Sequence, residues 1–596
     1  MSGGGRHRRR IRIAVPVAAA GLAAAVATAL LMSSANAATA LPTPTVKLST
    51  STPTLAELKK RVVGAVAGDD TAGETTKKSS MSAGTSASSV DPKIIGGTET
   101  TIATAPWMAQ LWYYDDKGTT SESDDIGFFC GGSVVSPTKI LTAAHCVKGY
   151  NWNANGAILT GTSQLPSDDG DLHGGTVSGV LRQWNHPSYS STTIDNDIAV
   201  LTLPAPITAT PIRMTTSGDT ASYASGTSAK LYGWGRTSST SQDISETLKT
   251  ATLPIKSDST CAGAYGTDFI KGHMVCAGNP ATGSDTGTTT ACNGDSGGPL
   301  VVNNRIVGVV SWGVKDCVEE GAYSVFSKVS TYVGAASPRV DDTNLSYSDH
   351  KADLWVRKSS NQEGFEKDSK GTSFAARESW GDWSGVNVIL QTDLNRDGYQ
   401  DFVVRRSADG AMFWMHWVNS SSSWATKQIA DNWKTRTRIV APGDVTGDAL
   451  PDLLSVDSGG VLWIYPGKGN GTFAARVEVR SGWNQYNSLR GHGDFTGDGK
   501  VDLIARSKSD SSVYLYKGTG KSGSEAFSSR IKVRSWGGYN AFDAPGDVTG
   551  DGKADFLART PGGTLYLYPG TGKATSEIFA TRISVGTDFA QYDIFG

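Results

Sequence analysis

The stretch from Cys292 to Leu300 carries the residues of this chain that are best suited to chemistry. It reads Cys-Asn-Gly-Asp-Ser-Gly-Gly-Pro-Leu, so the hydroxyl of Ser296 lies between glycines that let backbone N–H groups approach a reacting carbonyl. A serine attacks an amide only when a base takes its proton and fixed donors stabilise the oxyanion. The loop therefore predicts a histidine and a carboxylate elsewhere in the chain.

Both partners occur upstream in short motifs. His145 lies in Leu-Thr-Ala-Ala-His-Cys, and Asp197 lies in Asp-Asn-Asp-Ile-Ala-Val-Leu. Alone, the serine loop is equally compatible with an ordinary turn, and the other two residues with a structural pair. Together the motifs predict Ser296 as the nucleophile, His145 as general base and then acid, and Asp197 as the group that orients the imidazole. The backbone N–H groups of Gly294 and Ser296 would form the oxyanion hole.

The chain order His, Asp, Ser and the Gly-Asp-Ser-Gly-Gly-Pro motif resemble the chymotrypsin/trypsin family of serine endopeptidases. The resemblance covers residues 94–336 and includes Gly-Gly-Ser at 131–133, Gly-Trp-Gly at 233–235 and Ser-Trp-Gly at 311–313. It implies a chymotrypsin-like double β-barrel that hydrolyses proteins or peptides and needs no cofactor for catalysis. Short apolar runs between Gly, Ser, Thr and Pro clusters independently favour an all-β fold. The alternative is a non-catalytic binding protein or lectin built on the protease fold.

The segment Lys-Ile-Ile-Gly-Gly at 93–97 resembles the family's activation junction. The resemblance implies a zymogen that is cut after Lys93. The freed amine of Ile94 would then enter the fold and pair with Asp295, because a buried carboxylate needs a partner.

Specificity is the place where the chain departs from trypsin-like members. They carry an aspartate six residues before the nucleophile, where this chain has Thr290, and the pocket walls match Gly313 and Gly321. A Lys or Arg side chain would be desolvated there without a partner, which favours aromatic or large apolar residues at the cleavage position (P1). A basic preference stays open, because three acidic residues lie near that wall in sequence: Asp316, Glu319 and Glu320.

The N-terminal region predicts export. Five arginines precede an apolar run over residues 13–32 and Ala-Asn-Ala at 35–37, which favours a signal peptide over residues 1–37 rather than an uncleaved membrane anchor. A secreted protein agrees with six cysteines confined to residues 130–317, where disulfides are expected. Spacing alone allows fifteen pairings. The family resemblance selects Cys130 with Cys146, Cys261 with Cys276, and Cys292 with Cys317.

The other segments of the 596-residue chain differ in composition, and the net charge of −2 gives no indication of nucleic-acid binding. Residues 38–93 are rich in Thr, Ser, Ala and Lys and predict a flexible pro-segment or linker with one short helix near residues 55–66. Residues 337–350 form a polar connector. Residues 351–596 contain an internal repeat.

The repeat is marked by an acidic loop that occurs four times, starting at residues 393, 444, 494 and 547. In each copy the first and last aspartates are eight residues apart, and the last one opens an apolar strand. A fifth copy begins at Asp353 without the loop. These units resemble FG-GAP/VCBS-type repeats, which implies a β-propeller-like domain of about five blades. The terminal stretch 591–596 could close the ring, although a smaller open array is also compatible with the sequence.

Oxygen atoms at positions one, three, five and nine of such a loop converge on a hard cation, so calcium is the expected ligand. Metal-free Asx-turns are the alternative, and they are favoured in the second loop, where Ala449 replaces a glycine. The candidate ligands are Asp393, Asn395, Asp397, Asp401, Asp444, Thr446, Asp448, Asp452, Asp494, Thr496, Asp498, Asp502, Asp547, Thr549, Asp551 and Asp555.

Tryptophans of the repeats offer a second kind of site. They would either form a face that binds carbohydrate or another cell-surface ligand, or pack between blades, which is the favoured interpretation. We expect a monomer. The residues concerned are Trp355, Trp414, Trp463, Trp483 and Trp536.

Overall fold

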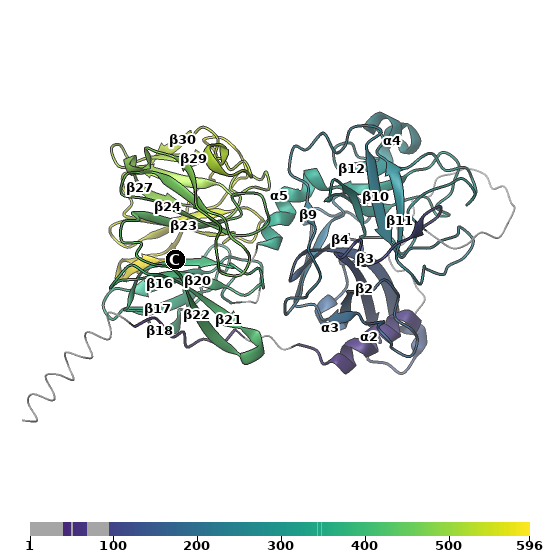
Figure 1. The fold of residues 1–596 in the computed structure, drawn as a ribbon, viewed down its shortest axis with the longest axis horizontal. Coiled ribbons are helices and arrows are strands. Elements are labelled where there is room, and N and C mark those ends of the chain that lie inside the picture. The colour runs from purple at the N-terminus through teal and green to yellow at the C-terminus, as the bar shows by residue number, and fades with distance from the viewer. Residues whose placement is uncertain (1–39, 49–51, 68–93, 342–343, 347–348) are drawn as a thin grey trace, which may run out of the picture.

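The computed structural model describes residues 40–48, 52–67, 94–341, 344–346 and 349–596. The predicted signal peptide and Lys93 lie outside the described residues. The chain forms two lobes, one from residue 94 to helix α5 (Val329–Val340) and one made of the repeats, with α5 between them (Figure 1). No helix in the described part is long and apolar enough to span a membrane.

The first lobe consists of two β-sheets, as expected for a double barrel. One sheet has seven strands in the order β6-β5-β2-β3-β4-β8-β7, and the other has eight, in the order β1-β11-β10-β13-β14-β15-β12 with β9 paired to β14. The strands of the first sheet are β2 Met108–Asp115, β3 Ile126–Ser136, β4 Lys139–Thr142, β5 Gly156–Thr160, β6 Thr176–Ser178, β7 Arg182–Asn185 and β8 Ala199–Thr202. Those of the second are β1 Thr98–Glu99, β9 Arg213–Met214, β10 Ser228–Gly233, β11 Lys249–Pro254, β12 Met274–Ala277, β13 Pro299–Val302, β14 Arg305–Trp312 and β15 Ser324–Lys328.

The helices of this lobe are few. They are α2 Leu55–Ala67, α3 Trp152–Asn155, α4 Asp258–Tyr265 and α5. The helix expected near residues 55–66 is α2, and it packs on strands β2 and β3 rather than belonging to a flexible linker. This packing explains why the first six residues of β2 are all buried: one face of the strand points into the barrel and α2 covers the other.

The second lobe is a closed ring of five four-stranded sheets, which confirms the expected blade number. The sheets are β16 Leu354–Lys358, β17 Glu363–Lys367 and β18 Glu378–Asp382 with β35 Tyr592–Phe595; β19 Val386–Thr392, β20 Asp401–Arg406, β21 Met412–Val418 and β22 Ser423–Ala430; β23 Arg438–Gly443, β24 Asp452–Val456, β25 Leu462–Tyr465 and β26 Val477–Arg480; β27 Tyr486–Arg490, β28 Leu503–Ser507, β29 Ser512–Tyr516 and β30 Ile531–Ser535; and β31 Ala541–Gly546, β32 Asp555–Arg559, β33 Leu565–Tyr568 and β34 Ile583–Gly586.

The ring is closed by the end of the chain. Strand β35 pairs antiparallel with β16, with Val356 opposite Phe595. The first strands β19, β23, β27 and β31 contact one another in sequence, and β35 contacts both β19 and β31, so these five strands surround the axis. Each acidic loop follows one of the strands β19, β23, β27 and β31. In the fifth sheet the corresponding strands, β35 and β16, are far apart in sequence, so no loop joins them directly.

One expectation on the junction needs correction, because residues 337–340, expected to be connector, form the last turn of α5. The tryptophans of the repeats agree with the favoured interpretation, since four of the five are buried, with exposed fractions of 0–5%, rather than forming a sugar-binding face. They are Trp355, Trp414, Trp483 and Trp536; Trp463 is half-buried.

Removing residues 592–596 is expected to lower the melting temperature of the repeat lobe, because β16 would lose its partner strand and the ring its closure. Calorimetry of the full chain with and without these residues measures the effect. An Asp593→Asn variant, which weakens only the ion pair with Arg357 (2.7 Å), should melt close to the unmodified protein. Equal melting of the truncated and complete chains would contradict the closure.

Candidate active site and acidic loops

His145 and Asp197 form a buried hydrogen-bonded pair. The Nδ1 atom of His145 lies 2.8 Å from Oδ2 of Asp197, and the backbone N–H of His145 donates to Oδ1 at 2.8 Å. Ser311 Oγ donates a further bond to Oδ2 at 2.6 Å. Three donors therefore hold a carboxylate whose residue is entirely buried. Sequence reasoning noted the Ser-Trp-Gly motif that contains Ser311 but gave this hydroxyl no role.

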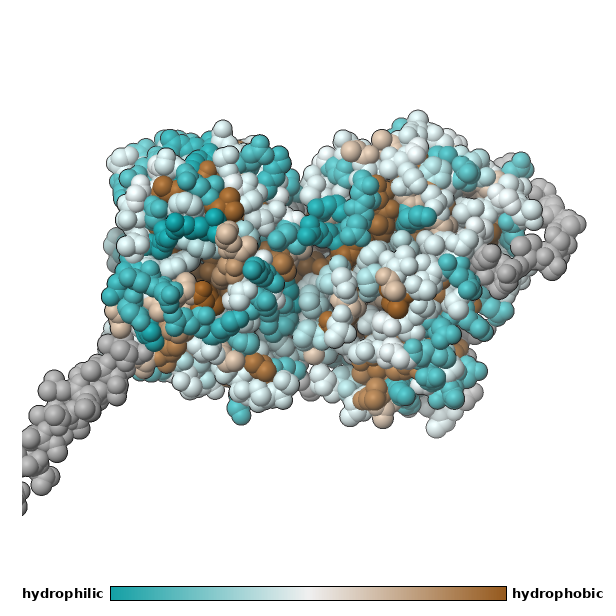
Figure 2. Space-filling view, viewed as in Figure 1, coloured by the Kyte–Doolittle hydropathy of each residue, from teal (hydrophilic) through white to brown (hydrophobic). Residues whose placement is uncertain are grey.

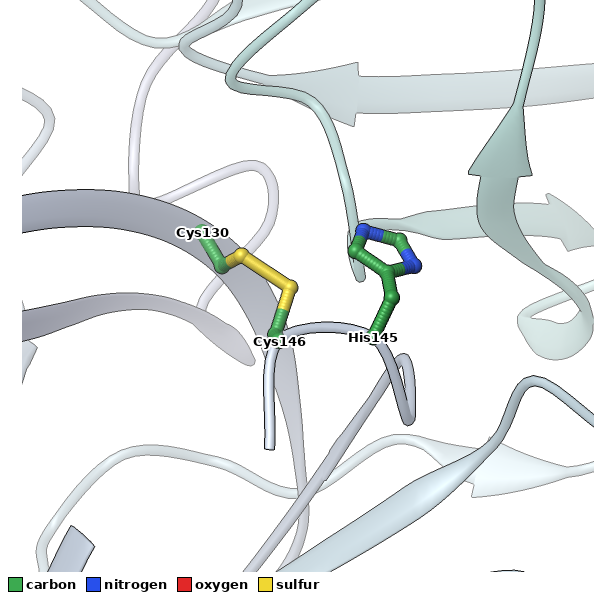
Figure 3. A group of neighbouring side chains, drawn as sticks. All are labelled: Cys130, His145 and Cys146. Atoms are coloured by element: carbon green, nitrogen blue, oxygen red, sulfur yellow. A yellow bond between two sulfur atoms is a disulfide. The ribbon is translucent and has the colours of Figure 1, made fainter. Parts of the chain in front are cut away.

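The other ring nitrogen of His145, Nε2, is not hydrogen-bonded to Asp197. Nε2 is buried and has no hydrogen-bond partner among the described residues. Figure 3 shows the ring turned away from the neighbouring Cys130–Cys146 disulfide. The two sulfur atoms lie close enough to the imidazole for a metal site, but they are bonded to each other and so are not thiolate ligands.

The loop of Ser296 packs directly against the segment that carries His145. The N–H of Gly131 donates to the carbonyl of Ser296 at 2.7 Å. A side chain at Gly297 (φ 81°) would collide with the hydroxyl of Thr142 and the carbonyl of Gly131. The glycine is required for this close approach, which brings the half-buried Ser296 to the segment of His145.

The backbone around Ser296 leaves two donors free. In the described part of the chain, neither the N–H of Gly294 nor that of Ser296 donates to a protein acceptor. Gly294 has a φ of 90°, and a side chain there would strike Ile244. The two groups expected to form the oxyanion hole are thus available to a ligand.

Asp295 is wholly buried beside this loop. The N–H groups of Gly235 and Cys292 donate to its two carboxylate oxygens at 2.9 and 3.0 Å. Burial raises the pKa of Asp295 to about 7, and no charged side chain offsets it among the described residues. Ile94 is also fully buried.

The predicted specificity pocket has a hydroxyl at its base. Thr290 is buried, and its Oγ1 lies 2.8 Å from Oγ of Ser324, a partner that sequence reasoning missed. A Cβ atom at Gly313 or Gly321 would meet no atom within 4 Å, so both glycines border open space. The acidic residues Asp316 and Glu320 near the wall are exposed.

The three disulfides have the pairing implied by the resemblance. Their Cα–Cα distances are 6.5, 6.0 and 5.5 Å for the pairs Cys130–Cys146, Cys261–Cys276 and Cys292–Cys317. The first joins the residue before Gly131 to the residue after His145. The third joins the first residue of the Ser296 loop to the predicted wall of the pocket.

In the acidic loops of the repeats, backbone N–H groups donate hydrogen bonds to the aspartate side chains. In the second loop the first aspartate, Asp444, accepts from the backbone N–H groups of Gly447, Asp448 and Ala449 at 2.7–3.1 Å. The last one, Asp452, accepts from Val445 and Gly467 at 2.9 Å each. Ala449 has a φ of 68°, so this position demands the left-handed conformation that favours glycine.

The first loop is the one whose donors fit a cation best. Asp401 is fully buried, and its Oδ1 atom has no partner among the described residues. Burial and the carboxylate of Asp397 raise the pKa of Asp393 to about 7, and burial raises that of Asp397 to about 6. In the described chain, no three acidic oxygens of one loop lie within 4.8 Å of one another. The loops bring their carboxylates near one another without forming a closed ligand set.

In the third and fourth loops, lysine and arginine side chains pair with the aspartates. Lys517 Nζ lies 3.4 Å from Asp498, Lys553 Nζ lies 2.9 Å from Asp551, and Arg339 of helix α5 pairs with Asp547. Their last aspartates, Asp502 and Asp555, are buried and accept from backbone N–H groups, as in the second loop.

The described residues contain a further acidic group, in the sheet that lacks a loop. Carboxylate oxygens of Asp353, Glu366 and Asp368 lie within 4.8 Å of one another. Glu366 accepts from Trp380 Nε1 at 2.8 Å, and burial together with the neighbouring carboxylates raises its pKa to about 9. A protonated Glu366 removes most of the repulsion in this group at neutral pH.

The acidic loops face the protease lobe. Besides the pair of Arg339 and Asp547, Arg396 pairs with Asp341, and Tyr399 Oη donates to the carbonyl of Pro204 at 2.9 Å. A cavity of about 550 Å³ lies at this junction, and none of the predicted triad or pocket residues lines it. In the space-filling view the two lobes meet along a continuous seam (Figure 2).

Both lobes match known protein families. Residues 94–335 match the family model described as Trypsin, and residues 393–455 and 494–558 match that of the FG-GAP-like repeat. A trypsin of Saccharopolyspora erythraea is 38% identical over 239 residues, which are 40% of this chain and 94% of that protein. Trypsin-3 of Salmo salar is 34% identical over 247 residues, 41% of this chain and 90% of that protein. The chain belongs to the trypsin family and is a serine endopeptidase with a C-terminal domain of FG-GAP-like repeats.

In the uncut protein, replacing Asp295 by Asn is expected to make stability less dependent on pH. A carboxyl whose folded pKa is raised stabilises the fold fully below about pH 3.8, and this contribution is lost as pH rises through about 7. Three pKa units correspond to at most about 4 kcal/mol. Denaturant unfolding at pH 5 to 8 in a Lys93→Gln background measures it, with exposed Asp316→Asn as the control. Parallel pH profiles for Asp295→Asn and its parent would contradict the assignment.

Proposed function

We propose that this protein is a secreted serine endopeptidase, made as a zymogen, in which Ser296, His145 and Asp197 form the catalytic triad. The observation that carries the proposal is the buried Asp197 holding Nδ1 of His145, with Nε2 unpartnered, beside the loop of Ser296. His145 Nε2 would take the proton of Ser296 as the hydroxyl attacks the peptide carbonyl, and would give it to the leaving amine.

The developing oxyanion would be bound by the N–H groups of Gly294 and Ser296. Each such donor contributes roughly 10²–10³ in rate. Asp197 keeps its charge throughout and stabilises the imidazolium, and the bond from Ser311 fixes its position. Secretion is supported by the arginine-rich, apolar N-terminus and by the three disulfides.

Activation would follow from the state of Asp295. Cleavage after Lys93 would free the amine of Ile94, whose side chain is already buried. The resulting ammonium would pair with the carboxylate of Asp295, and this pairing would lower the pKa that burial now raises. The ion pair would fix the backbone of the neighbouring oxyanion hole.

A fluorophosphonate probe is therefore expected to label Ser296 in the protein cut after Lys93 but not in the uncut chain. Lys93→Gln should prevent both the cut and the labelling, while Ser296→Ala should be cut by an added protease without being labelled. The measurement is probe incorporation with mass-spectrometric assignment of the labelled peptide. Labelling of full-length Lys93→Gln would contradict the activation step, and an unlabelled cut protein would favour the non-catalytic binding protein or lectin.

The pocket supports a preference for aromatic or large apolar residues at the cleavage position. Thr290 and Ser324 offer hydroxyls but no charge at its base, and Gly313 and Gly321 leave space beside it. A basic side chain would lose its hydration there without gaining a partner.

Thr290→Asp is expected to shift the preference towards Lys and Arg, because the carboxylate would pair with the incoming cation. Cleavage of a peptide library by the activated protein and the variant measures the shift. Asp316→Asn is the matched control and should change little. A clear Lys or Arg preference in the unmodified protein would overturn the pocket assignment, and its loss in Asp316→Asn would transfer the role to that residue.

The repeat lobe would bind substrate, a cell surface or matrix, and calcium would stabilise it through the acidic loops. The chemistry of the donors supports calcium in the first loop above all, where Asp401 has an unpartnered buried oxygen. Asp393, Asp397 and Asp401 would hold the ion with Asn395. The cation would supply charge neutralisation for carboxylates that repel one another.

Chelation is expected to lower the melting temperature of the repeat lobe, since binding to the folded state alone adds about 2.7 kcal/mol per site at a hundredfold excess over Kd. Asp397→Asn should reproduce part of the loss, and exposed Asp431→Asn, outside the loops, should not. Scanning calorimetry of the full chain with calcium or with chelator measures this. Identical melting in the two conditions would leave the loops as metal-free turns.

A further inference from the structure

Residues 40–48 of the segment before the protease lobe lie on the repeat lobe. Leu48 is 5% exposed in the core of the first two sheets, together with Trp380 and Trp417. Trp424 Nε1 donates to the carbonyl of Val46 at 2.8 Å. Figure 1 shows this purple stretch running along the edge of the lobe near β18. A stretch expected to be flexible is thus anchored by side chains and backbone.

Helix α2 of the same segment lies on the other lobe. It starts with a capping box, in which Glu57 accepts from the N–H of Thr54 at 2.9 Å and donates its own N–H to the hydroxyl of Thr54 at 3.2 Å. Its apolar face, formed by Leu58, Val62 and Ala65, is 0–5% exposed and packs on the first barrel. The helix therefore covers the outer face of that barrel's sheet with a buried apolar contact.

Polar contacts fix the position of α2. Arg61 donates to the carbonyl of Gly156 at 2.9 Å. Gly64 lies so close to the ring of Tyr114 that a Cβ atom there would be 2.5 Å from it. Leu55, by contrast, is 60% exposed on the same helix.

The two anchors lie close together in the sequence. Leu48 belongs to the repeat lobe, and Pro53 already lies against Gly179 of the protease lobe. Five residues of extended chain reach at most roughly 17 Å, so the contacts with the two lobes lie within that reach of each other.

We propose that residues 40–67 are a clamp that binds both lobes and remains bound, without a covalent link, after the chain is cut before Ile94. All six cysteines are paired within the protease lobe, so no disulfide retains this segment. The activated enzyme would accordingly consist of two chains held by α2 and by residues 40–48. Only the site of the natural cut rests on the proposed function.

The test uses the full chain with Ser296→Ala, to prevent self-digestion, and with a recognition site for a sequence-specific protease inserted between residues 68 and 93. After cutting, native size-exclusion chromatography is expected to show the N-terminal fragment co-eluting with residues 94–596. Val62→Asp should release at least half of the fragment, because it places a charge in the buried contact between α2 and the barrel. Leu55→Asp, the same change on the exposed face, should retain it.

A second measurement covers the case in which Val62→Asp fails to fold. In the cut, otherwise unmodified protein, the amides of α2 should exchange with deuterium at least 100-fold more slowly than those of an unfolded peptide. Separate elution of the unmodified fragment, equal retention of both variants, or unprotected α2 amides would overturn the clamp. Because the cut is engineered, a failure of activation at Lys93 leaves this result unaffected.

Discussion

A carboxylate that is taken out of water must be given hydrogen-bond donors or a cation, and this constraint recurs throughout the molecule. In the protease lobe it applies to Asp197, held by His145 and Ser311, and to Asp295, held by two backbone N–H groups. In the repeats it applies to the last aspartate of every loop. The glycines around these groups, and the left-handed turns they adopt, exist because the donors are backbone amides that must come close.

The same constraint joins the two lobes. Arg339, which is 1% exposed, extends from α5 to Asp547 of the fourth loop, and Arg396 of the first loop pairs with Asp341 at the end of α5. The acidic end of the ring is thus covered by the protease lobe. Apart from the cavity at this junction, the protease lobe covers this end, and a cation in the loops would act next to the junction between the lobes.

Much of the fold and of the candidate site was predictable from the sequence, because the motifs that mark them are short and continuous. The loop of Ser296, the motifs of His145 and Asp197, and the four acidic loops each lie within about nine consecutive residues. The four copies with a loop and the fifth without one predicted the five blades. The resemblance supplied the cysteine pairing that spacing alone could not. Other features depend on contacts between distant segments. Nothing near Ser311 or Ser324 in sequence shows that these hydroxyls meet Asp197 and Thr290.

The wrong expectation of a flexible linker has a physical reason as well. Residues 40–67 are polar enough to suggest a linker, yet three apolar residues at helical spacing suffice to bury α2 against a barrel whose outer face is itself apolar. The tryptophans, by contrast, follow the favoured interpretation: a ring of sheets needs large side chains between its blades, and four of the five indoles are buried.

The central claim is that Asp295 receives its cation from the chain's own cut end. The most direct measurement is an experimental structure of the protein cleaved after Lys93. The account predicts the amine of Ile94 within hydrogen-bond distance of the Asp295 carboxylate, about 3 Å. An amine of Ile94 left in solvent, with Asp295 still bonded only to the N–H groups of Gly235 and Cys292, would contradict it.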